Sequence, residues 1–127
     1  MKNPDIKACY VFPGQGSQFV GMRKNIYDKY EFTREIFDKG NEILEFDITK
    51  LMFNGPEEEL RKTINCQPAI LLANLAYFSV LTKNKKIPPC LLTLGHSIGE
   101  YSALVASGVL SLKDGIKLIN KRAELMS

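Results

Sequence analysis

Histidine is nearly absent from this sequence, whose 127 residues include His96 and no other histidine. The three cysteines, Cys9, Cys66 and Cys90, are widely spaced and form no Cys-x-x-Cys pair. A zinc-type site needs more thiolate and imidazole ligands, closer together, than this. The sequence therefore predicts no metal site. Its isolated thiols indicate a reducing compartment, either the cytoplasm or an organelle such as a plastid.

A large excess of charge of one sign is also missing. The 17 basic and 14 acidic residues leave a formal net charge of +3, and a hydrophobic content of 45% suits one globular domain. Basic residues cluster at Lys83, Lys85 and Lys86, where no aromatic residues are interspersed. We interpret this run as a solvated helix end and expect no nucleic-acid partner. Met1–Asp5 and the short strand-like run after it lack the apolar core of a secretory signal.

Few segments have the pattern of β-strands: only 6–12 and 91–94 are convincing. Apolar residues recur at helical spacing across 22–53, and Asn54-Gly55-Pro56 marks a stop before a new helix. A capping-box-like pattern at 111–114 opens the last helix. The expected fold class is therefore α/β, with few parallel strands and several helices.

The segment 65–81 lacks a polar face, being apolar nearly all round. We judge it too short and too interrupted to span a bilayer, so no membrane partner is expected. Such a helix must be buried on all sides. With only two strands to cover it, the segment has little to pack against. An isolated chain should then expose a large apolar patch.

The stretch with the clearest chemistry is the Gly-x-Ser-x-Gly motif at 95–99. It comes after the apolar run 91–94 and precedes a small-residue helical pattern, the strand–turn–helix context of a nucleophile elbow. We expect this sharp turn to leave no room for side chains at Gly95 and Gly99. The Ser97 hydroxyl would lie at a helix N-terminus, which favours an oxyanion. The alternative is a tight turn in which Ser97 only caps the helix.

A second glycine-rich loop comes after the first strand, with Gly14 and Gly16 on either side of Gln15. Two glycines let the backbone pass close to a neighbour and fix where the Gln15 side chain points. A dinucleotide fingerprint would require a further glycine where Phe19 stands. The Rossmann interpretation therefore fails. A functional loop and an ordinary strand-to-helix turn both stay open.

Arg122 interrupts the apolar half of the last helix. At about 100° per residue, that half carries Ile116, Leu118, Ile119, Ala123, Leu125 and Met126. A guanidinium buried there needs an anionic partner, because an unpaired buried charge is very costly. The partner is either a core carboxylate or a substrate carboxylate, unless the side chain extends past the helix end. The residues alone leave these interpretations open.

Three segments together resemble the malonyl-CoA:acyl carrier protein transacylase family. They are 11–18, 67–69 and 95–104, in this order and approximate spacing. Acyltransferase domains of polyketide and animal fatty-acid synthases are similar. The resemblance covers essentially the whole chain. It implies that residues 1–127 form the first part of an α/β-hydrolase-like large subdomain.

The resemblance also implies a role for each matching residue. Ser97 would take the malonyl group from malonyl-CoA, the substrate, and pass it to the phosphopantetheine thiol of acyl carrier protein, with no cofactor. The backbone N–H groups of Gln15 and Ile98 would form the oxyanion hole. Arg122 would pair with the malonyl carboxylate. His96 would support the elbow rather than act as base. The supporting glycines would be Gly14, Gly16, Gly95 and Gly99.

The chain departs from the family pattern in the region downstream of the elbow. The family's general base is a histidine far downstream, and the sequence stops at Ser127 before it. The small ferredoxin-like subdomain and the C-terminal return segment are also absent. We therefore expect an N-terminal segment that is inactive or nearly so alone and has the missing C-terminal portion as a partner. Cys66 stands where the family leads us to expect threonine.

Two alternative functions stay open. An esterase or lipase-like serine hydrolase would share the elbow, use water as acceptor and need no carboxylate clamp at Arg122. A non-catalytic fragment would work only by complementing the missing half.

Overall fold

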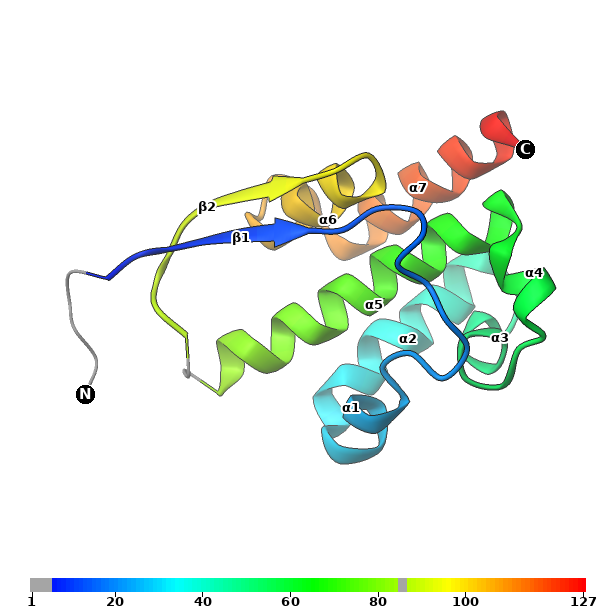
Figure 1. Ribbon diagram of the computed structural model, residues 1–127, viewed down its shortest axis with the longest axis horizontal. Helices are drawn as coiled ribbons and strands as arrows, with labels where there is room; N and C mark the ends of the chain where they lie inside the picture. The colour runs from blue at the N-terminus through cyan, green and yellow to red at the C-terminus, as the bar shows by residue number, and fades with distance from the viewer. Residues whose placement is uncertain (1–5, 85–86) are drawn as a thin grey trace.

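The computed structural model describes residues 6–84 and 87–127. Expectations for Met1–Asp5 and for Lys85 and Lys86 lie outside the described residues. The elements, in chain order, are β1 (Ala8–Phe12), α1 (Lys24–Lys29), α2 (Glu31–Leu44), α3 (Ile48–Asn54), α4 (Glu57–Arg61), α5 (Thr63–Lys83), β2 (Cys90–Gly95), α6 (Ile98–Ala106) and α7 (Leu112–Met126) (Figure 1). The expected α/β class, with few strands and several helices, is confirmed.

The two strands pair in parallel, with Tyr10 opposite Thr93 and Phe12 opposite Gly95. Parallel strands end at the same edge of a sheet. The glycine-rich loop after β1 and the elbow after β2 therefore lie side by side. The N–H of His96 donates to the carbonyl of Phe12 at 3.1 Å, which ties the two together.

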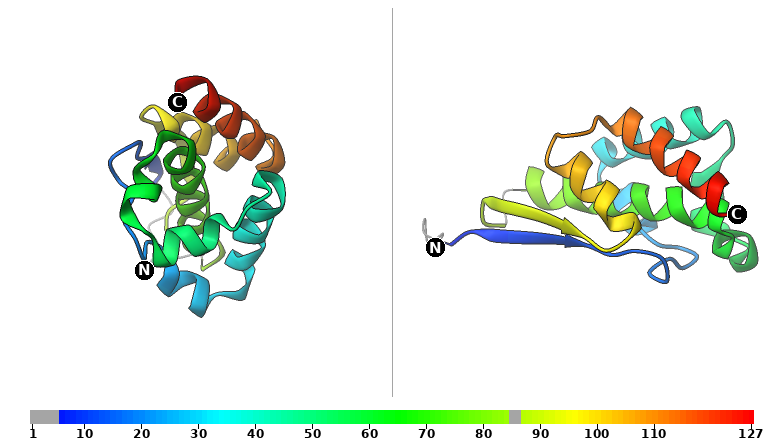
Figure 2. Two further views of the ribbon diagram at one scale, coloured as in Figure 1. Left: turned by 90° about the vertical axis from the view of Figure 1, so that its right-hand side faces the viewer. Right: turned by 90° about the horizontal axis from the view of Figure 1, so that it is seen from above.

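Helix α5 is the centre of the packing. It contacts α2, α4, α6 and α7, and every residue in 66–76 is buried. The left panel of Figure 2 shows the other helices arranged around it. The expectation that this helix lacks covering elements is wrong, because helices rather than strands cover it.

The length argument about the same segment is also wrong. Helix α5 extends from Thr63 to Lys83, past both ends of the segment 65–81, which makes it 21 residues long. Among the described residues it is the one helix long and apolar enough to cross a membrane, and 67% of its apolar window is buried inside the fold. A core helix passes the same test of length and composition.

The two faces of the sheet differ. On the inner face, the rings of Tyr10 and Phe12 meet Phe78 of α5 edge to face, at 5.6 and 5.7 Å between centroids. The right panel of Figure 2 shows the helices gathered on that side. On the outer face, Val11 is 69% and Leu94 53% exposed. The expected apolar surface is therefore present, but it lies on the sheet rather than around α5.

The sequence correctly predicts where α6 ends and where α7 begins. Gly108, with φ of 80°, comes after the last turn of α6 as a left-handed stop. The Ser111 hydroxyl accepts from the N–H of Asp114 at 3.0 Å, so the expected cap of α7 is confirmed. The region 22–53 is not one helix but three, since Tyr30 is extended and Glu45 has φ of 59°.

Candidate active site

The elbow after β2 is built on two glycines that no larger residue could replace. A Cβ at Gly95 would lie 1.9 Å from the carbonyl carbon of Gly99. A Cβ at Gly99 would lie 2.1 Å from the carbonyl oxygen of Phe12, in β1. The structure thus confirms the close approach expected at both positions. It also shows that the elbow helix is pressed against the neighbouring strand as well as against its own.

Ser97 has the backbone geometry of an elbow residue rather than of a helix cap. Its φ of 54° is positive, a conformation that side chains other than glycine rarely adopt. Strain of this kind concentrates at functional positions. The Ser97 side chain makes no capping hydrogen bond to α6, although the residue occupies the N-cap position. The interpretation of Ser97 as only a cap is therefore wrong.

Arg122 of α7 points at the Ser97 hydroxyl. Its Nη2 donates to Ser97 Oγ at 3.1 Å, and its Nη1 donates to Oε1 of Gln67 at 2.6 Å. Its guanidinium carbon lies 5.8 Å from the ring centroid of Tyr101. Across residues 6–84 and 87–127, Arg122 forms no salt bridge. Of the open interpretations, a structural ion pair with a core carboxylate is thus excluded within the described chain.

Gln67 is the site residue whose contact the sequence does not reveal. It is completely buried near the start of α5, and its Nε2 lies 3.5 Å from the sulfur of Met126. That contact leaves the amide oxygen for Arg122. Because the amide is neutral, it holds the guanidinium without cancelling its charge. A buried amide in an apolar helix needs hydrogen-bond partners, so the presence of Gln67 in this helix could have indicated a polar contact.

The loop after β1 touches the elbow through Gly14. A Cβ at Gly14 would lie 2.5 Å from the His96 carbonyl oxygen, so only glycine allows this approach. Gly16 has φ of 102°, and its N–H donates to the Gln18 side chain at 2.8 Å. Asn74 of α5 donates to the Pro13 carbonyl at 3.2 Å. These contacts fix the loop beside the elbow, which favours a functional loop over an ordinary turn.

The backbone donors predicted for an oxyanion hole are free. Ile98 is the first residue of α6, directly after Ser97, and Gln15 lies at the top of the glycine-rich loop. In the part of the chain that the structure describes, neither N–H donates a hydrogen bond. Neither N–H is therefore engaged by another acceptor within the described chain, as the predicted oxyanion hole requires.

His96 contributes its backbone to the elbow. Its carbonyl accepts from the N–H of Gly99 at 2.9 Å, and its side chain is exposed. Within the described residues the imidazole makes no hydrogen bond to Ser97, whose hydroxyl contacts Arg122. The neighbouring Cys66 is no rival nucleophile, because burial raises the pKa of its thiol to about 11.

The assembled groups suit one kind of chemistry. A hydroxyl at an elbow, two free N–H donors and an adjacent guanidinium favour acyl transfer from a substrate that carries a negative charge near its reacting carbonyl. Proton removal from Ser97 needs a base within hydrogen-bond reach. The described residues provide none there.

Comparison with known proteins agrees with this geometry. Residues 9–127 match the acyl transferase domain family. The chain is 44% identical over 121 residues to the malonyl CoA-acyl carrier protein transacylase of Bacillus subtilis, a match that covers 95% of this chain and 38% of that protein. The chain thus spans well under half the length of the curated relatives it matches.

Solved structures give the same result. An acyl carrier protein S-malonyltransferase from Vibrio cholerae superposes with a TM-score of 0.87 at 42% identity, covering 93% of this chain and 38% of that one. A malonyl-transacylase solved in complex with its type II PKS acyl-carrier protein superposes with a TM-score of 0.88 at 40% identity, covering 95% and 39%.

Proposed function

Because this chain belongs to the acyl transferase domain family, we propose that its protein transfers a malonyl group from malonyl-CoA to the phosphopantetheine thiol of an acyl carrier protein. The observation that carries this proposal is the Arg122 guanidinium, which contacts Ser97 and has no carboxylate partner in the described chain. Fatty-acid biosynthesis is the pathway proposed for this reaction. The proposed location is the cytoplasm.

The first half-reaction loads the serine. Ser97 Oγ attacks the thioester carbonyl of malonyl-CoA, and the N–H groups of Gln15 and Ile98 donate to the oxyanion. The C–O bond forms, the C–S bond breaks, and coenzyme A leaves as its thiol once it has gained the serine proton. In the second half, the carrier thiol attacks the ester, the new C–S bond forms, the C–O bond to Ser97 breaks, and Ser97 Oγ gains the proton that the thiol loses.

The position of Arg122 supports malonyl as the proposed acyl group. The malonyl carboxylate is one methylene away from the carbonyl that Ser97 attacks. A guanidinium whose Nη2 lies 3.1 Å from the attacking oxygen can therefore reach that carboxylate. Its planar pair of N–H donors matches a carboxylate in a bidentate way. A hydrolase for neutral esters needs no cation at this position, which disfavours the esterase alternative.

We also propose which parts of the enzyme residues 1–127 do not supply. We assign residues 1–127 to the first part of the large subdomain. The small ferredoxin-like subdomain, the returning segment and the general base would come from the rest of the protein. The coverage of 38% in the Bacillus subtilis relative supports this assignment.

The test is intact-mass spectrometry of the chain after mixing with malonyl-CoA. A single turnover is enough to give an adduct, so a slow rate does not prevent detection. Because the described chain places no base beside Ser97, we expect a malonyl adduct that accumulates slowly on the wild-type chain, is absent in Ser97→Ala and is removed by phosphopantetheinylated carrier protein. Surviving adduct in Ser97→Ala would refute the nucleophile. Loss of the adduct to water, unchanged by carrier protein, would favour the hydrolase.

A further inference from the structure

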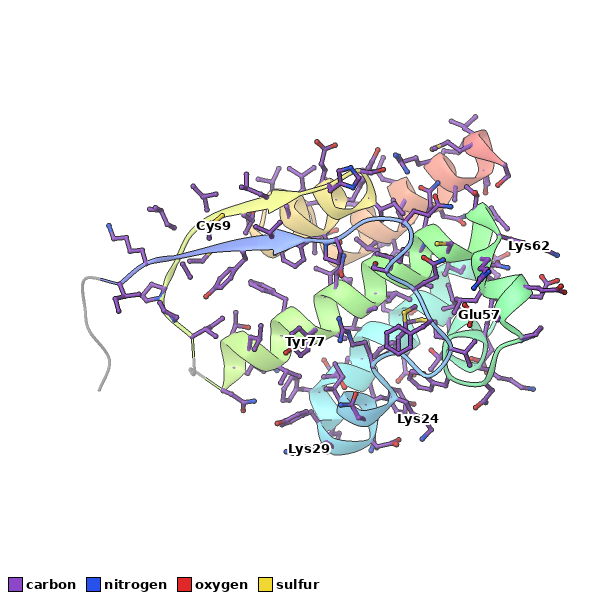
Figure 3. All side chains as sticks on the ribbon, in the orientation of Figure 1. Cys9, Lys24, Lys29, Glu57, Lys62 and Tyr77 are labelled. Atoms are coloured by element: carbon purple, nitrogen blue, oxygen red, sulfur yellow. The ribbon has the colours of Figure 1, made fainter. Side chains whose placement is uncertain are left out.

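A cavity lies between β1 and α5 and is also lined by Pro13 of the loop after β1. Its volume is about 300 Å³, at the lower end of the range for ligand pockets. Its walls are mostly apolar and include Phe12, Phe78 and Leu81. Figure 3 labels two of its lining residues, Cys9 on β1 and Tyr77 on α5. Among the described residues, Ser97, Gln67 and Arg122 do not line it, whereas Pro13 and Asn74, which hold the loop beside the elbow, do.

Among the described residues that line this cavity, Arg23 is the one with a charged side chain. Its guanidinium carbon lies 4.5 Å from the ring centroid of Tyr77. Its Nε is buried and has no hydrogen-bond partner. Among the residues that the structure describes, Arg23 forms no salt bridge. Arg23 is half-buried, and its Nε has no hydrogen-bond acceptor, so a cation placed this way favours an anion in the cavity that would accept from it.

The backbone holds Arg23 in an uncommon conformation. Its φ is 65°, in the left-handed region that glycine occupies at little cost. Arg23 precedes α1 here and makes no side-chain cap. Burial also lowers the pKa of Arg23, because desolvation disfavours the charged guanidinium. An anion bound at the side chain would offset this cost.

A second arginine of the chain shows what an ordinary surface stack looks like. The guanidinium carbon of Arg34 lies 5.5 Å from the ring centroid of Tyr27. Arg34 is exposed, and its Nε donates to the carbonyl of Tyr27 at 3.2 Å. Stacking on tyrosine is therefore compatible with satisfied donors. The unsatisfied, buried Nε distinguishes Arg23.

We propose that the cavity between β1 and α5 binds an aliphatic carboxylate of medium length, with the carboxylate on Arg23 and the hydrocarbon chain along Phe12, Phe78 and Leu81. The guanidinium supplies paired donors for the carboxylate oxygens. Apolar walls gain free energy by covering a hydrocarbon chain, which an inorganic anion cannot offer. The site is separate from Ser97 and does not depend on the proposed transfer reaction.

The experiment is isothermal titration calorimetry of the 127-residue chain with decanoate below its micelle concentration. We expect saturable binding that weakens by about tenfold or more in Arg23→Gly, because one or more charge-assisted hydrogen bonds are lost. This variant relieves the positive φ, so it should fold at least as well as the wild type. Arg23→Gln, which keeps a polar side chain but removes the charge and shortens the chain, should weaken binding similarly.

Three comparisons complete the design. Arg34→Gln is the matched control and should leave decanoate binding unchanged. Decanol should bind about tenfold more weakly than decanoate, since it lacks the charge. Inorganic phosphate should not compete. Equal decanoate affinity in Arg23→Gly and wild type, or equal affinity for decanol, would overturn the proposal. Competition by phosphate that depends on Arg23 would also overturn it, in favour of a simple anion site.

Discussion

Strands β1 and β2 have a tightly packed carboxyl end and an exposed outer face, and the two regions differ in how closely their atoms are packed. At the carboxyl ends, Gly95 and Gly99 bring backbone atoms so close that an added Cβ would overlap them. On the outer face, Val11 and Leu94 project from the same strands and are more than half exposed. The residues assigned to acyl transfer lie at the tightly packed carboxyl end, where close contacts fix the backbone conformation. Where the face is uncovered, apolar side chains remain without contacts.

The largest expected loss of stability would come from adding a side chain at the tightly packed carboxyl end of the strands. Gly99→Ala should destabilise the fold by more than about 3 kcal/mol, since the new Cβ meets the rigid Phe12 carbonyl. Gly108→Ala is the matched control, because a Cβ there has open space and only the positive φ of 80° to oppose it. It should cost about 1–2 kcal/mol. Urea unfolding of both variants measures the difference, and equal losses would contradict the close approach.

A smaller effect is expected from changing the charge beside Arg122. Gln67→Glu keeps the shape of the amide but places a carboxylate on the guanidinium, in competition with substrate. Selectivity for malonyl over acetyl loading should fall by about tenfold, the loss of one charge-assisted hydrogen bond. Asn120→Asp adds the same charge elsewhere on α7, where Asn120 contacts Glu124, and should leave selectivity unchanged.

Mass spectrometry of the acyl adducts measures both variants. Unchanged selectivity in Gln67→Glu would mean that the contact between Gln67 and Arg122 has no part in substrate choice. An equal fall in Asn120→Asp would point instead to the net charge of the chain.

The smallest effect on stability is expected on the exposed outer face. Leu94→Thr should change the free energy of unfolding by no more than about 0.5 kcal/mol, as is usual for exposed positions. It should also reduce self-association of the chain, because it removes exposed apolar surface. Sedimentation velocity at increasing concentration measures association. A large loss of stability would show that this face is packed in solution.

The sequence predicts the elbow well because its signals are local. The strand, Gly95, Ser97, Gly99 and the helix after them lie within a few residues, so one motif determines their arrangement. The inward position of Arg122 is likewise predictable from periodicity along one helix.

Contacts between distant segments were not predictable in the same way. Gln67 and Arg122 are 55 residues apart, and nothing in either local pattern specifies their pairing. Periodicity also overestimates the buried arc of α7. Leu118 and Leu125 are 46% and 75% exposed, because the neighbouring helices cover only the side that carries Ile116 and Ile119.

The assignment of function depends most on one claim, that Arg122 is held beside Ser97 to receive a substrate carboxylate. The most direct measurement is the ratio of malonyl to acetyl loading on Ser97, compared between wild type and Arg122→Ala. Two charge-assisted hydrogen bonds predict a fall in this ratio of about 100-fold, with acetyl loading retained. A parallel loss of malonyl and acetyl loading would contradict the claim and leave Arg122 a structural role.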